Sequence, residues 1–328
     1  MKLLIALHHR FELWNAPAWF AERLRRDFPR IDVIHRDSYD GIENQLADAE
    51  IAITWSLRPE QFAVARKLRW IHSPAAAVHQ LIFPELVRSD VILTNAREIH
   101  GPVVAEHVMA LMFALAKCIP AAVRMQQQHV WGQQLLWQRS PRPRELSGSV
   151  LGLVGLGSIG RAVAAHAHQL GMTVIAIREH PEKTPASAVD RVYPAAELDK
   201  LLAEADWIVL AVPVTGETRG LMHAGRLSRM KPDAYLINVG RGSLVDEKAL
   251  AAVLREKRIG GAALDVFEKE PLAADSPLWD LENVLITPHS AGLTDKLWER
   301  HYQQVSENLR RYLSARPLLG IVDKSAGY

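Results

Sequence analysis

The sequence predicts an α/β protein of two domains, each with a mainly parallel sheet covered by helices on both faces. Over the first hundred residues, short apolar runs typical of strands alternate with amphipathic stretches typical of helices. The same alternation starts again at Val150 and continues to Thr287. A chain of 328 residues also has a length that suits two compact units.

The first series contains both kinds of element. Helices are expected at residues 18–27 and 60–65, where apolar residues recur at helical spacing. Strands are expected at residues 3–7, 31–35, 51–55, 69–72 and 91–95. Because helices separate these strands, we expect the strands to run parallel in a sheet that is buried on both faces.

Residues 103–119 are the longest apolar stretch in the chain. Glu106, His107 and Lys117 lie within it, and the core of a bilayer would penalise all three side chains. The stretch therefore predicts a helix that is buried or faces another subunit, and no membrane partner is expected. Residues 131–145 show neither helical nor strand periodicity and predict a connecting loop.

The second series is the more regular of the two. Its first strand starts at Val150 and is followed by a helical stretch at residues 161–170. Further strands are expected at residues 174–177, 207–212, 234–239, 261–266 and 284–287. A long helix, rich in Arg and Glu on one face, is expected at residues 295–314.

Composition and charge argue against several kinds of partner and site. Hydrophobic residues make up 48% of the chain and charged residues 23%, which is enough core material for a globular fold. The net charge is only +2, with basic and acidic residues interspersed, so we expect no nucleic-acid partner. Cys118 is the single cysteine, which excludes an intrachain disulfide and favours a cytoplasmic location. No His, Cys and carboxylate spacing typical of a metal site is found, so we expect no catalytic metal.

The sharpest local pattern is an apolar strand that runs into Gly155, Gly157 and Gly160 and then into a helical stretch. The first glycine permits a tight turn, the second lets the backbone approach a pyrophosphate, and the third lets the helix pack closely on the strand. The first helical turn, with Ser158 and Ile159, presents backbone N–H groups and the positive end of the helix dipole to phosphates. This context predicts a dinucleotide site and argues against the alternative of a glycine-rich turn without a ligand.

Arg178 follows the next strand, near the place where an acidic residue usually binds the ribose 2′-hydroxyl. A guanidinium group suits a 2′-phosphate instead, so the sequence predicts a preference for NADP over NAD, with NAD possible. The alternative is that Glu179 binds the ribose while Arg178 is solvated.

Three further stretches complete the pattern: Asn238-Val-Gly-Arg-Gly-Ser-Leu-Val-Asp246, Gly261-Ala-Ala-Leu-Asp-Val-Phe-Glu-Lys-Glu-Pro271 and Ile286-Thr-Pro-His-Ser-Ala-Gly292. In order and spacing, together with the glycine loop, they resemble the D-isomer-specific 2-hydroxyacid dehydrogenase family over nearly the whole chain. The resemblance implies that Arg241 binds the substrate, that His289 transfers the proton and that Glu270 supports the histidine.

The resemblance also implies contacts around these residues. Asp265 should hydrogen-bond the nicotinamide carboxamide, and Val212 and Pro213 are further candidates for cofactor binding. The loop that contains Ala76 and Ala77 should bind the substrate carboxylate through its backbone N–H groups.

The three implied catalytic residues suit the reduction of a 2-keto acid. Negative charge develops on the carbonyl oxygen as a hydride reaches C2, and the planar fork of Arg241 can hold the carboxylate and polarise that carbonyl. Imidazole titrates near neutral pH, so His289 can donate a proton in reduction and accept one in oxidation. Glu270 would accept a bond from the other ring nitrogen, which fixes the tautomer and favours the protonated ring.

For the fold, the resemblance implies a Rossmann dinucleotide-binding domain at residues 99–292, inserted into a flavodoxin-like substrate-binding domain at residues 1–98 and 293–328. The active site is expected in the cleft between them. The apolar helix from residue 103 and the tryptophan-rich arm after it are expected to form the contact of a homodimer.

We therefore expect an oxidoreductase that uses NAD(P)H to reduce a small 2-keto acid, similar to glyoxylate or hydroxypyruvate, to the D-2-hydroxy acid. The alternative is a nucleotide-sensing binding protein that keeps the fold and acts through partner contacts. The intact set of Arg241, Glu270 and His289 favours the enzyme.

Overall fold

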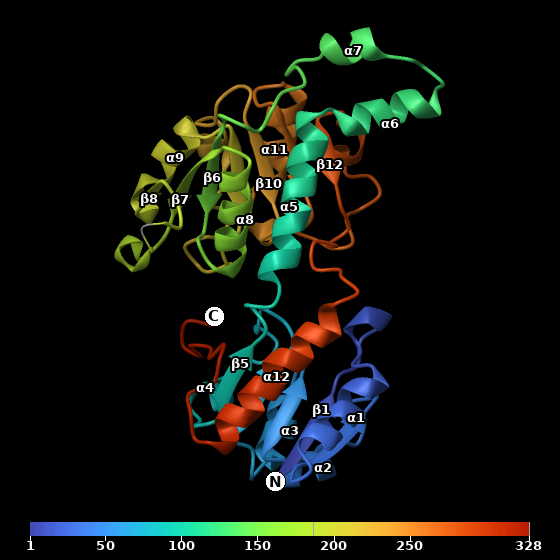
Figure 1. The fold of residues 1–328 in the computed structure, drawn as a ribbon, viewed down its shortest axis with the longest axis vertical. Helices are drawn as coiled ribbons and strands as arrows, with labels where there is room; N and C mark the ends of the chain where they lie inside the picture. Colours follow the sequence, from blue (N-terminus) through green and yellow to red (C-terminus); the bar gives the residue numbers. More distant parts are fainter. Residues whose placement is uncertain (186, 328) are drawn as a thin grey trace. The chain divides into compact units, whose positions relative to one another are not determined.

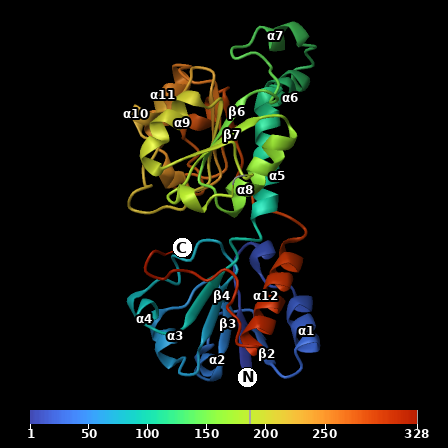
Figure 2. The same ribbon diagram turned by 60° about the vertical axis from the view of Figure 1, so that its left-hand side comes forward.

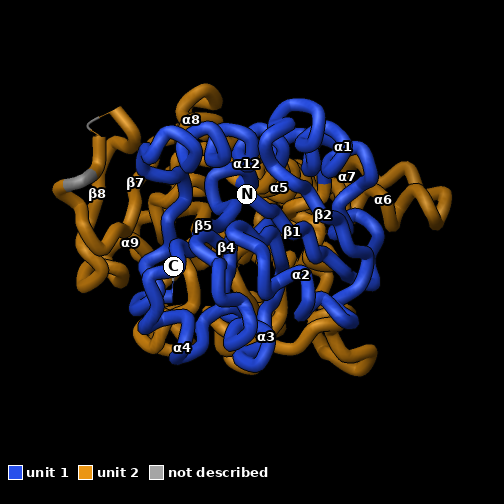
Figure 3. Tube along the Cα trace, turned by 90° about the horizontal axis from the view of Figure 1, so that it is seen from below, with its two compact units in different colours: residues 1–100, 294–328 blue, residues 101–293 orange. Residues whose placement is uncertain are grey.

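The computed structural model describes residues 1–185 and 187–327, which form two compact units. Met1–His100 and Thr294–Tyr328 form the first unit, and Gly101–Leu293 form the second, as Figure 3 shows by colour. Each unit contains one parallel sheet with helices on both faces. The predicted fold class, two doubly wound α/β domains, is therefore confirmed.

The first unit contains a five-stranded parallel sheet in the order β2-β1-β3-β4-β5 (Figure 1). This is the flavodoxin-like order that the sequence led us to expect. Its strands are β1 (Lys2–Ala6), β2 (Asp32–Arg36), β3 (Ile51–Thr54), β4 (Trp70–Ser73) and β5 (Ile92–Asn95). Its helices are α1 (Ala18–Asp27), α2 (Glu43–Asp48), α3 (Pro59–Val64), α4 (Pro84–Val87) and α12 (Leu297–Leu313), with a 3-10 turn η1 (Glu12–Trp14).

Apolar side chains fill both faces of this sheet. On one face, α1 and α12 pack against the strands through Phe20, Trp298 and Val305, while α2, α3 and α4 cover the other face (Figure 2). Leu3, Leu4 and Ile5 of β1 are all at most 1% exposed, so successive side chains of this strand are buried on opposite faces. That is why the strand is a continuous apolar run.

The second unit contains a seven-stranded parallel sheet in the order β12-β11-β10-β9-β6-β7-β8. The chain reverses direction across the sheet between β9 and β6, and such a switch point is where open α/β sheets bind ligands. The strands are β6 (Val150–Val154), β7 (Thr173–Ile177), β8 (Arg191–Tyr193), β9 (Trp207–Leu210), β10 (Tyr235–Asn238), β11 (Gly261–Leu264) and β12 (Val284–Ile286).

Helices again cover both faces of this sheet. The helices are α5 (Gly101–Ala116), α6 (Ile119–Gln127), α7 (Gln133–Trp137), α8 (Ser158–Gln169), α9 (Leu198–Glu204), α10 (Ala224–Leu227) and α11 (Glu247–Arg255). The 3-10 turns are η2 (Pro181–Lys183), η3 (Ala195–Glu197), η4 (Gly242–Leu244) and η5 (Pro277–Asp280). One core cluster joins α5 and α8 to the sheet, and a second joins α9, α10 and α11 to its other face (Figures 1 and 2).

Two expectations for the segment before β6 were wrong. The apolar stretch at 103–119 is not one helix, because α5 ends at Ala116 and Cys118 adopts a left-handed conformation with φ +53° before α6 begins. The loop expected at 131–145 contains the short helix α7. Within the described residues, no single helix has the length and apolarity to cross a membrane; α5 and α6 reach them only as a pair, bent by 65°.

We expect the protein to lose stability in mild acid because of buried histidines in the first unit. His72 is fully buried on β4, its Nδ1 lies 2.9 Å from Thr94 Oγ1, and burial lowers its pKa from 6.5 to about 3. Burial also lowers the pKa of His301 on α12. The unfolded chain therefore binds protons that the folded chain excludes. The free energy of unfolding does not depend on these histidines above pH 6.5, and it decreases as the pH falls from 6.5 towards 3.

The slope expected from each such histidine is up to about 1.4 kcal/mol per pH unit. Urea unfolding at a series of pH values between 7.5 and 5 measures it. Glutamine does not titrate, so His72→Gln is expected to reduce the dependence of the unfolding free energy on pH to the part that His301 contributes. An unchanged dependence in this variant would show that His72 does not contribute.

Candidate active site

Three neighbouring strands of the second unit bring the predicted catalytic residues to one edge of the sheet. β10 leads into Arg241, β11 into Asp265 and Glu270, and β12 into His289. Since β10, β11 and β12 are adjacent and parallel, their carboxyl ends meet at the same edge. The residues that the sequence grouped by motif are thus also grouped in space.

His289 and Glu270 form a close pair. His289 Nδ1 lies 2.6 Å from Glu270 Oε2, and Glu270 Oε1 accepts a bond of 3.0 Å from the backbone N–H of Phe267. An ionised carboxylate only accepts, so Nδ1 carries the proton and the ring presents Nε2 as its other polar atom. The His289 side chain is 50% exposed.

Arg241 is held at the start of η4 by the turn after β10. Asn238 Nδ2 donates to the carbonyl of Arg241 at 3.0 Å, and Asn238 Oδ1 accepts from the N–H of Gly240 at 3.1 Å. Burial lowers the pKa of the Arg241 guanidinium, whereas the nearby carboxylate of Glu270 raises it. A charge that has already lost part of its hydration is well suited to bind an anion.

Asp265 has a role in the structure that the motif did not indicate. Its side chain is 1% exposed, and its Oδ1 accepts a 2.6 Å bond from the hydroxyl of Thr287. His107 on α5 lies 3.1 Å from Thr287 Oγ1, measured from Nε2. Neither Thr287 nor His107 was assigned to the site from the sequence. The two residues are 180 positions apart, and the helix that contains His107 was interpreted only as a packing element. The contact between Asp265 and a nicotinamide stays a prediction.

The glycine loop has the shape that a dinucleotide requires. Gly155 has φ +104°, and a Cβ there would lie 2.7 Å from the carbonyl oxygen of Ala211, while a Cβ at Gly160 would lie 2.2 Å from the carbonyl oxygen of Gly155. A Cβ at Gly157 would meet nothing within 4 Å, so the backbone is open to a ligand at this point. Ser158 and Ile159 form the first turn of α8, whose N–H groups point out of the helix end.

The other predicted cofactor residues follow strands of the same sheet. Arg178 follows β7, and its Nη1 donates to Thr184 Oγ1 at 3.3 Å. Val212 and Pro213 follow β9, and the Val212 side chain contacts the turn at Gly155. All of these residues lie at carboxyl ends of β6, β7 and β9, on both sides of the switch point.

Ala76 and Ala77 lie in the first unit, in the loop after β4. Asn95 Nδ2 donates to the carbonyl of Ala76 at 2.7 Å, and the N–H of Ala96 donates to the carbonyl of Ala75 at 3.1 Å. Within residues 1–185 and 187–327, the N–H groups of Ala76 and Ala77 have no hydrogen-bond partner. The loop is therefore fixed through its carbonyls and keeps two N–H groups available.

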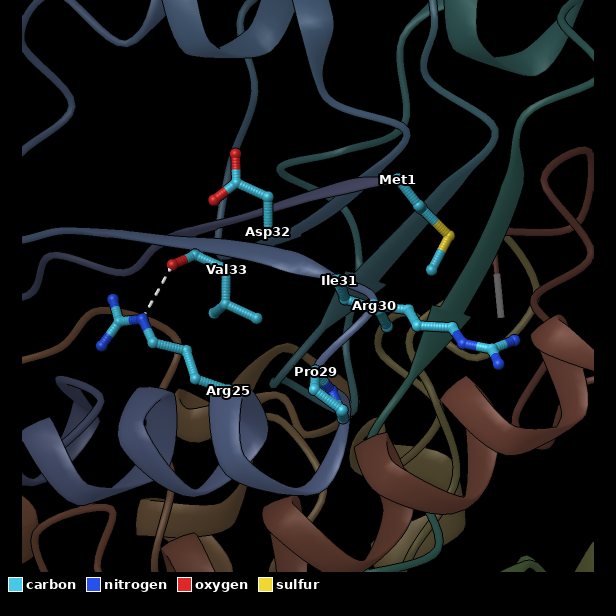
Figure 4. Close-up of a pocket in the computed structure, with 7 residues that line it drawn as sticks. All are labelled: Met1, Arg25, Pro29, Arg30, Ile31, Asp32 and Val33. Carbon is cyan, nitrogen blue, oxygen red and sulfur yellow. Dashed lines mark hydrogen bonds between the residues drawn. The ribbon is translucent and has the colours of Figure 1, made fainter.

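The first unit also has a surface pocket, which includes neither Ala76 nor Ala77 in its lining. Figure 4 shows residues at the amino ends of β1 and β2 that line it, including Met1, Arg30 and Asp32. Arg25 Nε donates to the carbonyl of Val33 at 3.0 Å, and a dashed line marks this bond in Figure 4. Parallel sheets bind ligands at their carboxyl ends, so this pocket carries no functional assignment. Among the described residues, no group of three or more His, Cys, Asp or Glu side chains has the geometry to hold a metal ion.

A family model and curated relatives match this chain. The model for the D-isomer specific 2-hydroxyacid dehydrogenase, NAD binding domain, matches residues 109–291. A glyoxylate reductase from Korarchaeum cryptofilum is 36% identical over 262 residues, which are 78% of this chain and 76% of that protein. A D-3-phosphoglycerate dehydrogenase from Synechocystis is 32% identical over 89% of this chain but only 54% of its own length, so the chain spans about half of that relative.

Solved structures are similar over the whole chain. A D-isomer specific 2-hydroxyacid dehydrogenase family protein from Aeromonas salmonicida has a TM-score of 0.82 at 33% identity, over 98% of this chain and 99% of that chain. An NADPH-dependent glyoxylate/hydroxypyruvate reductase from Sinorhizobium meliloti, in complex with NADP and sulfate, has a TM-score of 0.81 at 28% identity, over 100% of this chain and 99% of that chain.

Proposed function

Because the chain belongs to the D-isomer specific 2-hydroxyacid dehydrogenase family, we propose that it reduces a small 2-keto acid, similar to glyoxylate or hydroxypyruvate, to the D-2-hydroxy acid, with NADPH as its preferred cofactor. The observation that carries the proposal is the 2.6 Å contact between His289 Nδ1 and Glu270 Oε2, with Arg241 on the adjacent strand end. This arrangement provides a proton donor and a fixed positive charge at one edge of the sheet.

Each residue of the proposed set has a separate task. The guanidinium of Arg241 holds the substrate carboxylate and stabilises the negative charge that develops on the carbonyl oxygen. His289 donates the proton from Nε2 to that oxygen, while Glu270 keeps the proton on Nδ1 and stabilises the imidazolium form. A reduced nicotinamide, when held by the glycine loop, would supply the hydride that C2 accepts.

The residues of the glycine loop fit the cofactor. Gly155, Gly157 and Gly160, with Ser158 and Ile159, would hold the pyrophosphate at the start of α8, where the open space at Gly157 permits close approach. Arg178 would bind the 2′-phosphate, and Val212, Pro213 and Asp265 would contact the remainder of the cofactor. The N–H groups of Ala76 and Ala77 would bind the substrate carboxylate.

The proposed division of labour follows the predicted domains. Residues 99–292 would bind the dinucleotide, and residues 1–98 and 293–328 would bind the substrate; the family model at residues 109–291 supports the first part. The proposal includes a cytoplasmic location, which is supported by a single cysteine, Cys118, that is buried.

A panel of substrates tests the proposal directly. Oxidation of NADPH and NADH is followed by absorbance with glyoxylate, hydroxypyruvate, pyruvate and bulkier keto acids. D-3-phosphoglycerate and (S)-sulfolactate, named in the relatives, are added in the oxidative direction. We expect turnover with a small keto acid. Tight NADPH binding without turnover of any acid would favour the alternative, a nucleotide-sensing binding protein.

Replacing Arg178 by alanine is expected to remove the preference for NADPH. Loss of hydrogen bonds from a charged group should lower kcat/KM for NADPH by about ten- to a hundred-fold, with little change for NADH. Steady-state kinetics with both cofactors measures the effect, and Arg178→Lys, which keeps the charge, is expected to lose less. If the wild-type protein prefers NADH, or if Arg178→Ala affects both cofactors equally, Arg178 does not read the 2′-phosphate.

We propose that the protein is a homodimer that uses the exposed apolar surface of α5, α6 and α7. Trp131 is 94% exposed, and further exposed apolar side chains lie on or between these helices: Phe113, Ile119, Val123, Val130, Leu135 and Trp137. An apolar surface of this kind is typical of a contact with another protein, and a second copy is the commonest partner. Light scattering is expected to give twice the mass of the chain.

The double variant Trp131→Asp with Leu135→Asp is expected to be monomeric, since two charges would be buried without partners at the contact. Leu313→Asp is the matched control, because Leu313 is an exposed apolar residue at the end of α12 in the other unit. A wild-type protein with the mass of one chain would contradict the dimer.

A further inference from the structure

Four residues of the loop that carries His289 form hydrogen bonds with one buried residue, Asp265. Asp265 Oδ1 accepts bonds from the Thr287 hydroxyl at 2.6 Å and the Ser290 N–H at 2.8 Å, and Oδ2 accepts from the Ala291 N–H at 3.0 Å. The backbone carbonyl of Asp265 accepts from the His289 N–H at 2.8 Å. One aspartate therefore binds four of the five residues at 287–291, including the proposed proton donor itself.

These hydrogen bonds hold His289 in an unfavourable backbone conformation. His289 has φ +51°, in the left-handed region that costs a side chain with a Cβ some free energy. Such a conformation persists only where surrounding contacts determine it. The backbone conformation from which the imidazole projects is thus held by the bonds to Asp265.

His107 extends this network from the loop to helix α5. Its Nε2 lies 3.1 Å from Thr287 Oγ1 and 3.6 Å from Asp265 Oδ1. A threonine hydroxyl has one proton, and Thr287 uses it to donate the 2.6 Å hydrogen bond to the Asp265 carboxylate. His107 Nε2 must therefore carry a proton and donate it to Thr287 Oγ1.

The resulting chain of donors runs in one direction, from His107 through Thr287 to Asp265, and each bond polarises the next. The burial of His107 lowers its pKa, while the Asp265 charge raises it. A neutral ring with its proton on Nε2 satisfies this chain. The side chain of His107 is 20% exposed, so water does not readily replace it.

We propose that His107 is a positioning residue for the loop 287–291, and that it keeps His289 in the geometry for proton transfer by donating to Thr287. This inference rests on the proposed function of His289. His107 touches neither the imidazole of His289 nor its partner Glu270 in any contact of the described residues. Its effect is therefore expected on the chemical step and not on the binding of substrate or cofactor.

The test compares two variants of His107 in the full-length protein. His107→Phe keeps a planar ring but removes the hydrogen-bond donor. It is expected to lower kcat for keto-acid reduction about five-fold, which is the effect expected from the loss of one buried hydrogen bond. KM and the NADPH dissociation constant are expected to stay within two-fold of wild type. His107→Gln keeps an N–H donor at similar reach and is expected to restore kcat to within two-fold. His166→Phe, a half-buried histidine in the last turn of α8, is the matched control and is expected to leave kcat unchanged.

A second readout does not depend on turnover. Hydrogen–deuterium exchange of a peptide that covers residues 287–293 is expected to be faster in His107→Phe than in wild type, with β10 and β11 unchanged. Thr287→Val breaks the same chain at its middle and keeps the shape of the side chain. It is expected to show the same two effects, so the inference is still tested if His107→Phe fails to fold.

The possible results separate the two proposals. Wild-type kcat in His107→Phe, or equal losses in His107→Phe and His107→Gln, would overturn the positioning role. If the wild-type protein reduces no keto acid, the proposed function fails, and the exchange data alone decide the inference. Faster exchange confined to residues 287–293 then supports the fastening by His107, and unchanged exchange refutes it.

Discussion

Replacing His289 by alanine is expected to lower kcat by about 10² to 10⁴, the usual contribution of a general acid. The reason is that the imidazole is the group proposed to protonate the carbonyl oxygen, and Glu270 is already bonded to its other nitrogen at 2.6 Å. Water can replace the ring as a proton donor only slowly. Steady-state reduction of the best keto acid of the panel measures the loss.

NADPH binding provides the control for this variant. Its dissociation constant, measured by the change in nicotinamide fluorescence, is expected to stay within a few-fold of wild type, since the glycine loop lies on other strands. His166→Ala is expected to behave as wild type. Turnover of His289→Ala at a wild-type rate would exclude His289 as the proton donor.

Replacing Arg241 by lysine is expected to be nearly as damaging, with kcat/KM for the keto acid lowered by about 10² to 10³, as on removal of one oxyanion donor. Lysine keeps the positive charge but presents a single point donor, whereas the guanidinium can contact a carboxylate and the neighbouring carbonyl together. The Arg241 side chain is also partly buried, and the loss of hydration lowers the pKa of its guanidinium.

Arg229→Lys is the matched control for this substitution, because Arg229 is an exposed arginine of the same unit. This conservative change is expected to have no effect on kcat/KM. If kcat/KM of Arg241→Lys equalled that of Arg229→Lys within experimental error, the need for a planar guanidinium at this position would be contradicted.

Much of the fold could be predicted because its strands are buried on both faces. In β1 and β9 every side chain of the central run is apolar, so the strands stand out as short hydrophobic blocks between amphipathic helices. The strand that leads into Gly155 was also predictable, since few structures other than a tight strand-to-helix turn need glycines at that spacing. Both signals are local in the sequence.

The features that were missed depend on contacts between distant residues. The break between α5 and α6 is an exception: it lies at Cys118, which adopts φ +53°, and Pro120 in the first turn of α6 is a local signal for it that was not used. The bonds between His107, Thr287 and Asp265 join three elements that only the folded sheet brings together. For the same reason the motif indicated Asp265 as a cofactor contact but did not reveal that its carboxylate fastens the His289 loop.

Transfer of deuterium is the measurement that tests the central claim most directly. NADPH labelled with deuterium at the transferable position of its nicotinamide is incubated with the fastest keto acid of the panel whose product has a stereocentre at C2, which excludes glyoxylate, and the product is analysed by NMR and chiral chromatography. We predict a D-2-hydroxy acid that carries the deuterium at C2, formed by wild type and not at a measurable rate by the double variant Arg241→Lys with His289→Ala. A product of L configuration, or one without deuterium at C2, would contradict the account.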